Sequence, residues 1–528
     1  MTFELVRWRL RWMVPVLVLL TMAMLAGLLA AARADAGEQQ STEVIVQLRD
    51  GTSLDEGRAL VRSVGGTVSR ELSIINGLGA VVSPAAAEAL ERDNRVRAVS
   101  ANAPVASSGQ SLSTPSLLQT AFNQSVRAEK AWAKSVVGWG VGVAVVDTGI
   151  AGQLPDFKLS TDDPRSRVIA SAVVNPNART AGDTYGHGTH VAGLIAGNGN
   201  NRTGADPFDA DYVGTAPYAN LISIKVADEE GNASLIDVID GIQFAVEHKA
   251  DYNIRVLNLS LNSTVAESYK TDPLDAAVEE AWFSGIVVVT AAGNAGTADD
   301  AVSYAPANDP YVITVGAVDD RGTDSVLDDQ LASWSSRGTT QDGIRKPEVL
   351  APGAHLVSTM SSGSAYTTMC PTCMVGTDYM RLGGTSMSAA VTSGVVADIL
   401  QARPSWTPDQ VKGALMNTAR DVPGVGVEPQ TDVAMSLLSG DSRLRSNTGL
   451  TPSTLIDPAT GKIDMTKADW SRASFRSADQ LLSAPWSPSA SWRCSICSGD
   501  GTAVDPNASW RASWRASWRA SWRTSFSK

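Results

Sequence analysis

The sequence predicts an α/β fold, a doubly wound and mainly parallel sheet flanked by helices, preceded by a small α+β unit. Several apolar, β-rich runs lack polar alternation, as is typical of strands buried on both faces: 141–146, 221–226, 256–261, 286–290 and 311–318. Helical stretches lie between and after them, at about 235–248, 274–282, 388–401 and 408–418. Reactive side chains are therefore expected at the carboxyl ends of the strands.

The small unit spans residues 41–105. Alternation and helical periodicity predict strands at 43–48, 78–83 and 96–100, and helices at 53–64 and 84–92. About 65 residues is a marginal size for independent stability. Residues 106–117 are rich in Ser, Gly, Gln and Pro, which predicts a linker open to cleavage before a large unit at 118–440.

Residues 1–36 are typical of an export signal. A basic start with Arg7, Arg9 and Arg11 precedes an apolar run at 13–31 and small-x-small cleavage patterns at 32–36. The alternative is a retained membrane anchor, because the apolar run is about long enough to span a bilayer. A cleaved signal predicts a secreted, extracellular protein, or one associated with the cell envelope.

Four cysteines form two CxxC pairs, Cys370 with Cys373 and Cys494 with Cys497. Export favours disulfides, although a four-thiolate zinc site or a redox motif would use the same spacing. The first pair lies in an apparent insertion that is either a lid beside an active site or a surface loop.

The chain has 528 residues and a net charge of −12, which argues against a nucleic-acid partner. Residues 441–528 are a low-complexity tail with Ala-Ser-Trp-Arg repeats, which place Trp510, Trp514, Trp518 and Trp522 at a period of four. Tryptophan beside arginine suits an anionic surface such as the cell envelope. The alternatives are that the tail docks onto this chain's own sheet or onto another chain, or that it is an extension that is trimmed off.

Three segments carry the side chains of a nucleophilic mechanism. Asp147 ends a buried strand, His187 begins a small-residue helix, and Ser386 follows a Gly-Gly-Thr turn into another helix. A serine hydroxyl needs an imidazole as general base, and that imidazole needs an acid to fix its tautomer. Each segment alone is weak evidence, but together they occur in the chain order Asp, His, Ser, which is one of the orders that serine triads take.

These segments resemble the three active-site signatures of the subtilisin-like serine proteases, the subtilases. The resemblance implies that Ser386 is the nucleophile, His187 the general base and then acid, and Asp147 the residue that orients it. Asn294, in Ala-Ala-Gly-Asn, matches the residue that donates to the oxyanion, with the Ser386 N–H as second donor. It also implies that 41–105 is an inhibitor-like propeptide, and that the chemistry requires no cofactor.

Substrate binding is placed by the same resemblance. Ser260, Leu261 and Asn262 match the family strand that pairs with the substrate backbone beside the specificity pocket, which implies broad specificity for polypeptides. The family often has Gly where Asn262 stands, so the width of the pocket is open. After Ser386 the family usually has Pro where this chain has Ala390, a position that shapes the helix and is not catalytic.

A structural calcium ion is a second implication. Asp156 resembles a family position that can ligate calcium, and the loop with Asn198, Asn200 and Asn201 offers further oxygens. A capping aspartate and a polar loop are an equal alternative. His190 follows His187 on the same helical face, and without a third ligand in place we interpret it as structural.

The sequence therefore favours a secreted serine endopeptidase that processes itself. One alternative is a catalytically silent adhesion or scaffold protein with the tail as its working part. The intact set of Asp147, His187, Ser386 and Asn294 argues against that alternative. The other alternative is a processing protease that cleaves only a narrow set of sequences.

Overall fold

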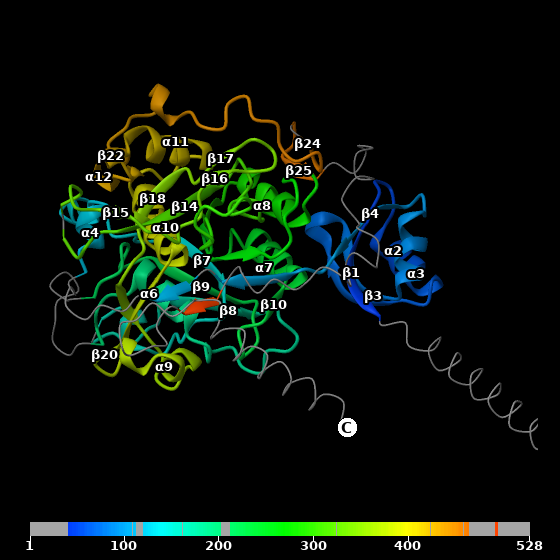
Figure 1. Cartoon of the computed structure of the whole chain (residues 1–528), viewed down its shortest axis with the longest axis horizontal. Coiled ribbons are helices and arrows are strands. Elements are labelled where there is room, and N and C mark those ends of the chain that lie inside the picture. The colour runs from blue at the N-terminus through cyan, green and yellow to red at the C-terminus, as the bar shows by residue number, and fades with distance from the viewer. Residues whose placement is uncertain are drawn as a thin grey trace, which may run out of the picture.

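The computed structural model describes residues 41–107, 109–111, 120–160, 162–201, 212–323, 325–422, 424–457, 459–463 and 492–494. A small N-terminal unit lies against a larger α/β unit (Figure 1). Within these residues no helix has both the length and the apolar character that crossing a bilayer requires. The export signal expected at 1–36 lies outside the described residues.

An eight-stranded sheet forms the centre of the large unit and confirms the predicted fold class. Its order is β15-β14-β13-β11-β7-β9-β8, with β18 also paired to β14. All pairings are parallel except β14 with β15. The strands are β7 Gly142–Asp147, β8 Val168–Val173, β9 Asn220–Lys225, β11 Ile254–Leu259, β13 Val287–Ala291, β14 Ile313–Asp319, β15 Gln330–Leu331 and β18 Val349–Pro352.

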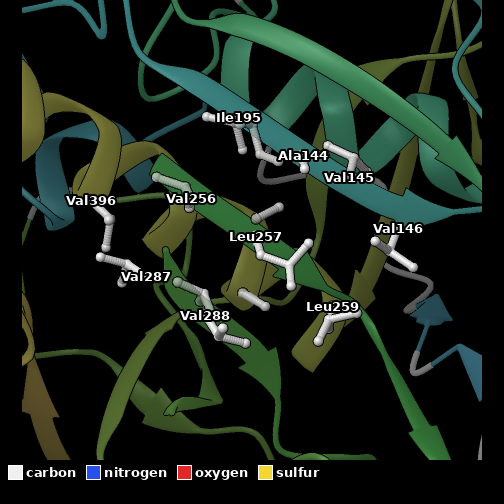
Figure 2. Close-up of a cluster of buried hydrophobic side chains, with 14 of the residues drawn as sticks. Ala144, Val145, Val146, Ile195, Val256, Leu257, Leu259, Val287, Val288 and Val396 are labelled. Atoms are coloured by element: carbon white, nitrogen blue, oxygen red, sulfur yellow. The ribbon is translucent and has the colours of Figure 1, made fainter. Parts of the chain in front are cut away.

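The middle strands are buried on both faces, which explains their unbroken apolar runs. Figure 2 shows Val145 and Leu257, from β7 and β11, in one cluster with Val288 of β13. Ile195 and Val396 enter the same cluster from helices on the sheet. Burying a side chain of this size contributes about 1.5–3 kcal/mol, so this layer holds the strand ends in fixed positions.

The principal helices are α6 His187–Ala196, α7 Leu235–Glu247, α8 Pro273–Phe283, α10 Thr385–Ala402 and α11 Pro408–Thr418. Local sequence sets several starts. Ser234 forms a capping box with Asp237 at α7, and Asp272 accepts N–H bonds at the start of α8. Helix α10 begins three residues earlier than predicted, so Ser386 lies in its first turn.

The small unit is an antiparallel sheet of order β2-β3-β1-β4 with two helices. Its elements are β1 Thr42–Leu48, α2 Leu54–Ser63, β2 Thr67–Leu72, β3 Gly77–Val82, α3 Pro84–Glu91 and β4 Val96–Ala101. Sequence analysis missed β2, because this strand is mostly polar and largely solvent-facing.

The small unit docks on α7 and α8. Leu72 and Ile75 are fully buried and belong to the core cluster of the large unit. The Arg70 guanidinium lies 3.1 Å from carboxylate oxygens of both Asp237 and Asp240 on α7. Apolar burial and an ion-pair cluster thus join the two units at one face.

After β4 the chain crosses the large unit as two short strands. β5 (Pro104–Ser107) lies between β10 (Ala233–Ser234) and β12 (Leu261–Ser263). β6 (Gly109–Ser111) pairs with β21 (Tyr379–Gly384) and with β26 (Trp492–Cys494), the orange-red arrow in Figure 1. The first residues of the predicted linker therefore form strands that pair with the large unit.

The start of the predicted low-complexity tail packs on the large unit. Tyr269 donates from its hydroxyl to the Thr451 carbonyl at 2.9 Å, and the Ser453 N–H donates to Glu279 of α8. Apart from β26, the tail beyond 463 lies outside the described residues, as do most of its Trp-Arg repeats.

Shorter elements are α4 Phe122–Ser125, α5 Ala128–Trp132, β16 Gly338–Thr339, β17 Arg345–Lys346, β19 Leu356–Thr359, α9 Ala365–Met369, β20 Met374–Val375, β22 Arg420–Val422, β23 Gly426–Glu428, α12 Thr431–Ala434, β24 Ile456–Asp457 and β25 Lys462–Ile463.

Candidate active site

The acid and the imidazole predicted from sequence are in direct contact. Asp147 is the last residue of β7 and His187 the first of α6. The Asp147 Oδ1 lies 2.7 Å from the His187 Nδ1, and both side chains are buried. The Thr148 N–H donates to the same oxygen at 2.7 Å. This contact favours a proton on Nδ1 and directs basicity to Nε2.

A second acid, Asp183, fixes the start of α6. Its two carboxylate oxygens accept N–H bonds from Gly186 at 2.7 Å and Thr189 at 2.8 Å, and one also accepts the Thr148 hydroxyl at 2.9 Å. Asp183 thereby ties the helix that carries His187 to the residue after Asp147. Sequence analysis missed it, although an acid just before a helix start is a recognisable capping signal.

Ser386 lies where a glycine turn leads β21 into α10. Gly384 donates its N–H to the Gly353 carbonyl at 2.7 Å. The Ser386 hydroxyl donates to the Ser260 carbonyl at 3.1 Å, and the Ser260 hydroxyl donates back to the Ser386 carbonyl at 3.1 Å. Because α10 packs against α6, the serine and histidine helices are neighbours.

Asn294 is held beside Ser386 through the intervening Thr385. Its Oδ1 accepts both the Thr385 N–H and the Thr385 hydroxyl at 3.1 Å. The Thr385 hydroxyl also accepts the Gly293 N–H at 3.0 Å. With Oδ1 anchored by two donors, the carboxamide has a fixed orientation in which Nδ2 is its donor end. Thr385 is a supporting residue that the motifs did not single out.

The predicted substrate-binding residues lie next to this group. Ser260 separates β11 from β12, so the strand predicted at 256–261 is broken at the residue that contacts Ser386. Leu261 and Asn262 belong to β12, which pairs with β5 of the same chain. Asn262 donates from Nδ2 to the Ala291 carbonyl at 3.1 Å.

The insertion with the first cysteine pair lies beside His187. Tyr366 of α9 presents its ring to the imidazole at 6.3 Å between centroids and 86° between planes. The Tyr366 N–H donates to the Tyr185 carbonyl at 3.1 Å, and a disulfide joins Cys370 to Cys373. Of the two sequence-based alternatives, the structure supports the position beside the site. Cys497 lies outside the described residues.

His190 has a structural environment, as predicted. It is fully buried, and its Nε2 lies 3.0 Å from the Met380 carbonyl, to which the neutral ring donates. Burial lowers the pKa of His190 to about 3, so the ring stays uncharged. Among the described residues, no group of three or more His, Cys, Asp or Glu side chains is arranged to hold a metal ion.

Within the described residues, the side chain of Asp156 is surrounded by hydrogen-bond donors, and the calcium site stays a prediction. Its Oδ1 accepts the Asn201 N–H at 2.7 Å and the Tyr379 hydroxyl at 3.1 Å. The buried Arg167 donates to the Asp156 carbonyl at 2.6 Å. These partners are hydrogen-bond donors and a cation, whereas calcium requires several converging oxygens. The Asn198 amide donates within the loop, to the Lys158 carbonyl. Residues 202–211 lie outside the described part.

Comparison with known proteins agrees with this geometry. A model of the subtilase family matches residues 138–440. Serine protease AprX of Bacillus subtilis is 36% identical over 368 residues, covering 68% of this chain and 78% of that protein. The thermostable alkaline protease of Halalkalibacterium halodurans is 32% identical over 410 residues, covering 78% and 94%.

A solved structure shows the same fold. Fervidolysin from Fervidobacterium pennivorans, described as a keratinolytic enzyme related to subtilisin, aligns with a TM-score of 0.59 at 26% identity. The alignment covers 76% of this chain and 62% of the fervidolysin chain.

A parallel α/β sheet whose strand and helix ends bring an aspartate, a histidine and a serine helix together defines a serine hydrolase of the subtilisin type. The chain belongs to the subtilase family and is a subtilisin-like serine protease.

Proposed function

We propose that the protein is a secreted endopeptidase that hydrolyses peptide bonds through an Asp147–His187–Ser386 triad and cleaves its own precursor. The observation that carries the proposal is the buried 2.7 Å contact between Asp147 and His187, on elements that pack beside the helix of Ser386. The name of the Bacillus subtilis relative, serine protease AprX, supports the same reaction class.

Each residue has one part in the reaction. Asp147 holds the Nδ1–H of His187, so Nε2 is the atom that takes the Ser386 hydroxyl proton as Oγ attacks the substrate carbonyl carbon. The protonated imidazole then gives this proton to the leaving amine. Water then attacks the acyl-enzyme by the same proton-transfer steps, which releases the second product and restores the Ser386 hydroxyl.

Asn294 stabilises the negative charge that develops on the substrate oxygen. Its carboxamide is oriented by Thr385, which precedes Ser386. The second donor is the Ser386 N–H, in the first turn of α10, whose N–H groups the helix itself does not use. A donor that is positioned before the reaction starts costs no reorganisation when charge appears.

Main-chain pairing supports use of extended polypeptides as substrates. β10 and β12 hold β5 between them, so a segment in this position is bound through its backbone. The chain's own residues 41–107 act in this proposal as a propeptide that binds α7 and α8 and enters the cleft. Export requires the signal at 1–36, and the tail repeats attach the enzyme to an anionic envelope surface.

Kinetics of triad variants tests the proposal. For Ser386→Ala and His187→Ala, kcat should fall about 10⁴–10⁶-fold on a peptide substrate, and the double variant should fall no further, because the residues act as a unit. Ser388→Ala is the matched control, since its hydroxyl donates to the Ala351 carbonyl from the same helix.

Two results would overturn the mechanism. One is a folded Ser386→Ala protein that keeps its rate. The other is a double variant whose loss equals the product of the single losses. Export is checked by expressing the whole chain with its own start and sequencing the N-terminus of the protein in the medium.

A further inference from the structure

A buried lysine beside the triad aspartate carries an inference that rests on the proposed function. Lys225 is the last residue of β9 and is fully buried. We propose that Lys225 is a positioning residue for the triad, which holds the turn after Asp147 so that the carboxylate keeps its contact with His187. Sequence analysis did not single it out, although it is the one charged residue in the apolar run 221–226.

The turn after Asp147 is held by two consecutive residues of the neighbouring strand and its extension. β7 and β9 are parallel neighbours (Figure 1), and their ladder ends with Asp147 opposite Lys225. The Val226 N–H donates to the Asp147 carbonyl at 2.9 Å. The next carbonyl along the chain, that of Thr148, accepts from the Lys225 ammonium at 2.7 Å. The lysine side chain thus continues the ladder beyond the residue where β7 ends.

Thr148 passes this restraint to both partners of the acid–imidazole contact. Its N–H donates to the Asp147 Oδ1 at 2.7 Å, the oxygen that also lies 2.7 Å from the His187 Nδ1. Its hydroxyl donates to Asp183 at 2.9 Å and accepts the N–H of Gly188, the residue after His187, at 2.9 Å. Holding the Thr148 backbone therefore holds the carboxylate and the start of the histidine helix together.

The charge of Lys225 suits this turn better than a neutral donor would. An ammonium in a protein interior is costly unless opposite charges compensate it. The carboxylates of Asp147 and Asp183 are both buried, and both bond to the threonine whose carbonyl accepts from the lysine. The ammonium therefore offsets part of the negative charge that these two carboxylates bring into the site.

Kinetics on the mature enzyme gives the first test. Lys225→Met removes the donor and the charge but keeps most of the side-chain length. This variant should lower kcat about 10- to 100-fold, because small displacements of reacting groups have effects of this size. KM should stay within about twofold, because the lysine acts on the chemical step. Lys158→Met is the matched control and should keep the wild-type kcat, since the half-buried Lys158 ammonium also donates to a carbonyl after β7, that of Gly152 at 3.4 Å.

A spectroscopic measurement separates positioning of the triad from a general loss of stability. The chain has four histidines, so isotope labelling of histidine gives few imidazole signals in an NMR spectrum, and His187→Ala assigns the one of interest. The Ser386→Ala precursor is used, because it needs neither activity nor processing. Adding Lys225→Met should move the Nδ1–H resonance of His187 to higher field, because its hydrogen bond to Asp147 becomes weaker. Lys158→Met should leave this resonance in place.

Lys225→Gln protects the test against a methionine variant that does not fold. Glutamine keeps a donor on a shorter and uncharged side chain, so kcat should fall below that of wild type and the His187 resonance should move in the same direction. A folded variant of either kind with an unchanged kcat and an unmoved resonance would overturn the role of Lys225. A loss confined to KM or to thermal stability would also overturn it, and the triad would stand. A wild type that reacts with no fluorophosphonate would instead overturn the proposed function.

Discussion

The small N-terminal unit and the large unit are stabilised by different means. The large unit is built around parallel strands buried on both faces, whereas the small unit has a separate core under one antiparallel sheet. Two side chains of the small unit, Leu72 and Ile75, also pack in the core of the large unit. The small unit therefore has a core of its own and also contributes side chains to a core that it shares with the large unit.

The carboxyl groups of the two units have pKa values that are shifted in opposite directions. In the small unit, the hydrogen bond from Arg95 lowers the pKa of the surface carboxyl of Asp93 to about 2. In the large unit, burial raises the pKa of Asp320 to about 7 and that of Glu428 to about 8. Protonation of Asp93 at low pH therefore removes stabilisation from the small unit, whereas ionisation of Asp320 and Glu428 at high pH removes stabilisation from the large unit.

The largest expected effect is at the apolar docking contact. Truncating the fully buried Ile75 to alanine should cost about 2–5 kcal/mol, because it removes buried surface and leaves a cavity. Inhibition of the mature enzyme by the separate N-terminal fragment should weaken at least about 30-fold. Unchanged inhibition by a folded Ile75→Ala fragment would contradict the dependence of the small unit on this face.

The ionic part of the docking face should contribute less. Arg70→Ala should weaken inhibition by about 1–2 kcal/mol, or about 5- to 30-fold, since Arg70 is 16% exposed and still partly solvated. Arg92→Ala is the control, because Arg92, at the end of α3, pairs with Glu88 of that helix. Equal losses from the two variants would show that the α7 contact has no special role.

The raised pKa of Glu428 predicts an alkaline loss of stability in the large unit. Its pKa is about 8 when folded, against an ordinary value of 4.5. The folded state therefore binds more protons, and the stabilisation is complete below pH 4.5 and lost as the pH rises through 8. Glu428→Gln should flatten this slope by up to about 1.4 kcal/mol per pH unit.

Thermal unfolding of the mature enzyme from pH 5 to 9 measures that slope. Burial also raises the pKa of the Asp329 carboxyl, to about 6, so some pH dependence of stability should remain in the variant. A variant with the slope of wild type would exclude Glu428 as its source.

The smallest expected effect is on catalysis alone, and it comes from a substitution of Tyr366. Tyr366→Ala should lower kcat/KM about 2- to 10-fold, in line with about 0.5–1.5 kcal/mol for an aromatic contact, here with His187. Inhibition by the N-terminal fragment should not change, and Tyr366→Phe should behave as wild type.

Sequence reasoning identified what local pattern determines. Unbroken apolar runs predicted the central strands, and three short motifs predicted Asp147, His187 and Ser386. It missed β8, whose residues alternate between half-buried and exposed positions, and β2, which is mostly polar. It also missed Asp183, because the role of that carboxylate depends on the distant Thr148. The pairing of β5 with β10 and β12, and of β6 with β21, was hidden by a composition that is typical of a linker.

Labelling of the exported protein with a fluorophosphonate probe tests the central claim most directly, when the labelled peptide is mapped by mass spectrometry. We predict one probe per mature enzyme, attached to Ser386, with no labelling of Ser386→Ala and strong loss in His187→Ala. A folded, processed wild type that takes up no probe, or takes it up at another serine, would contradict the account.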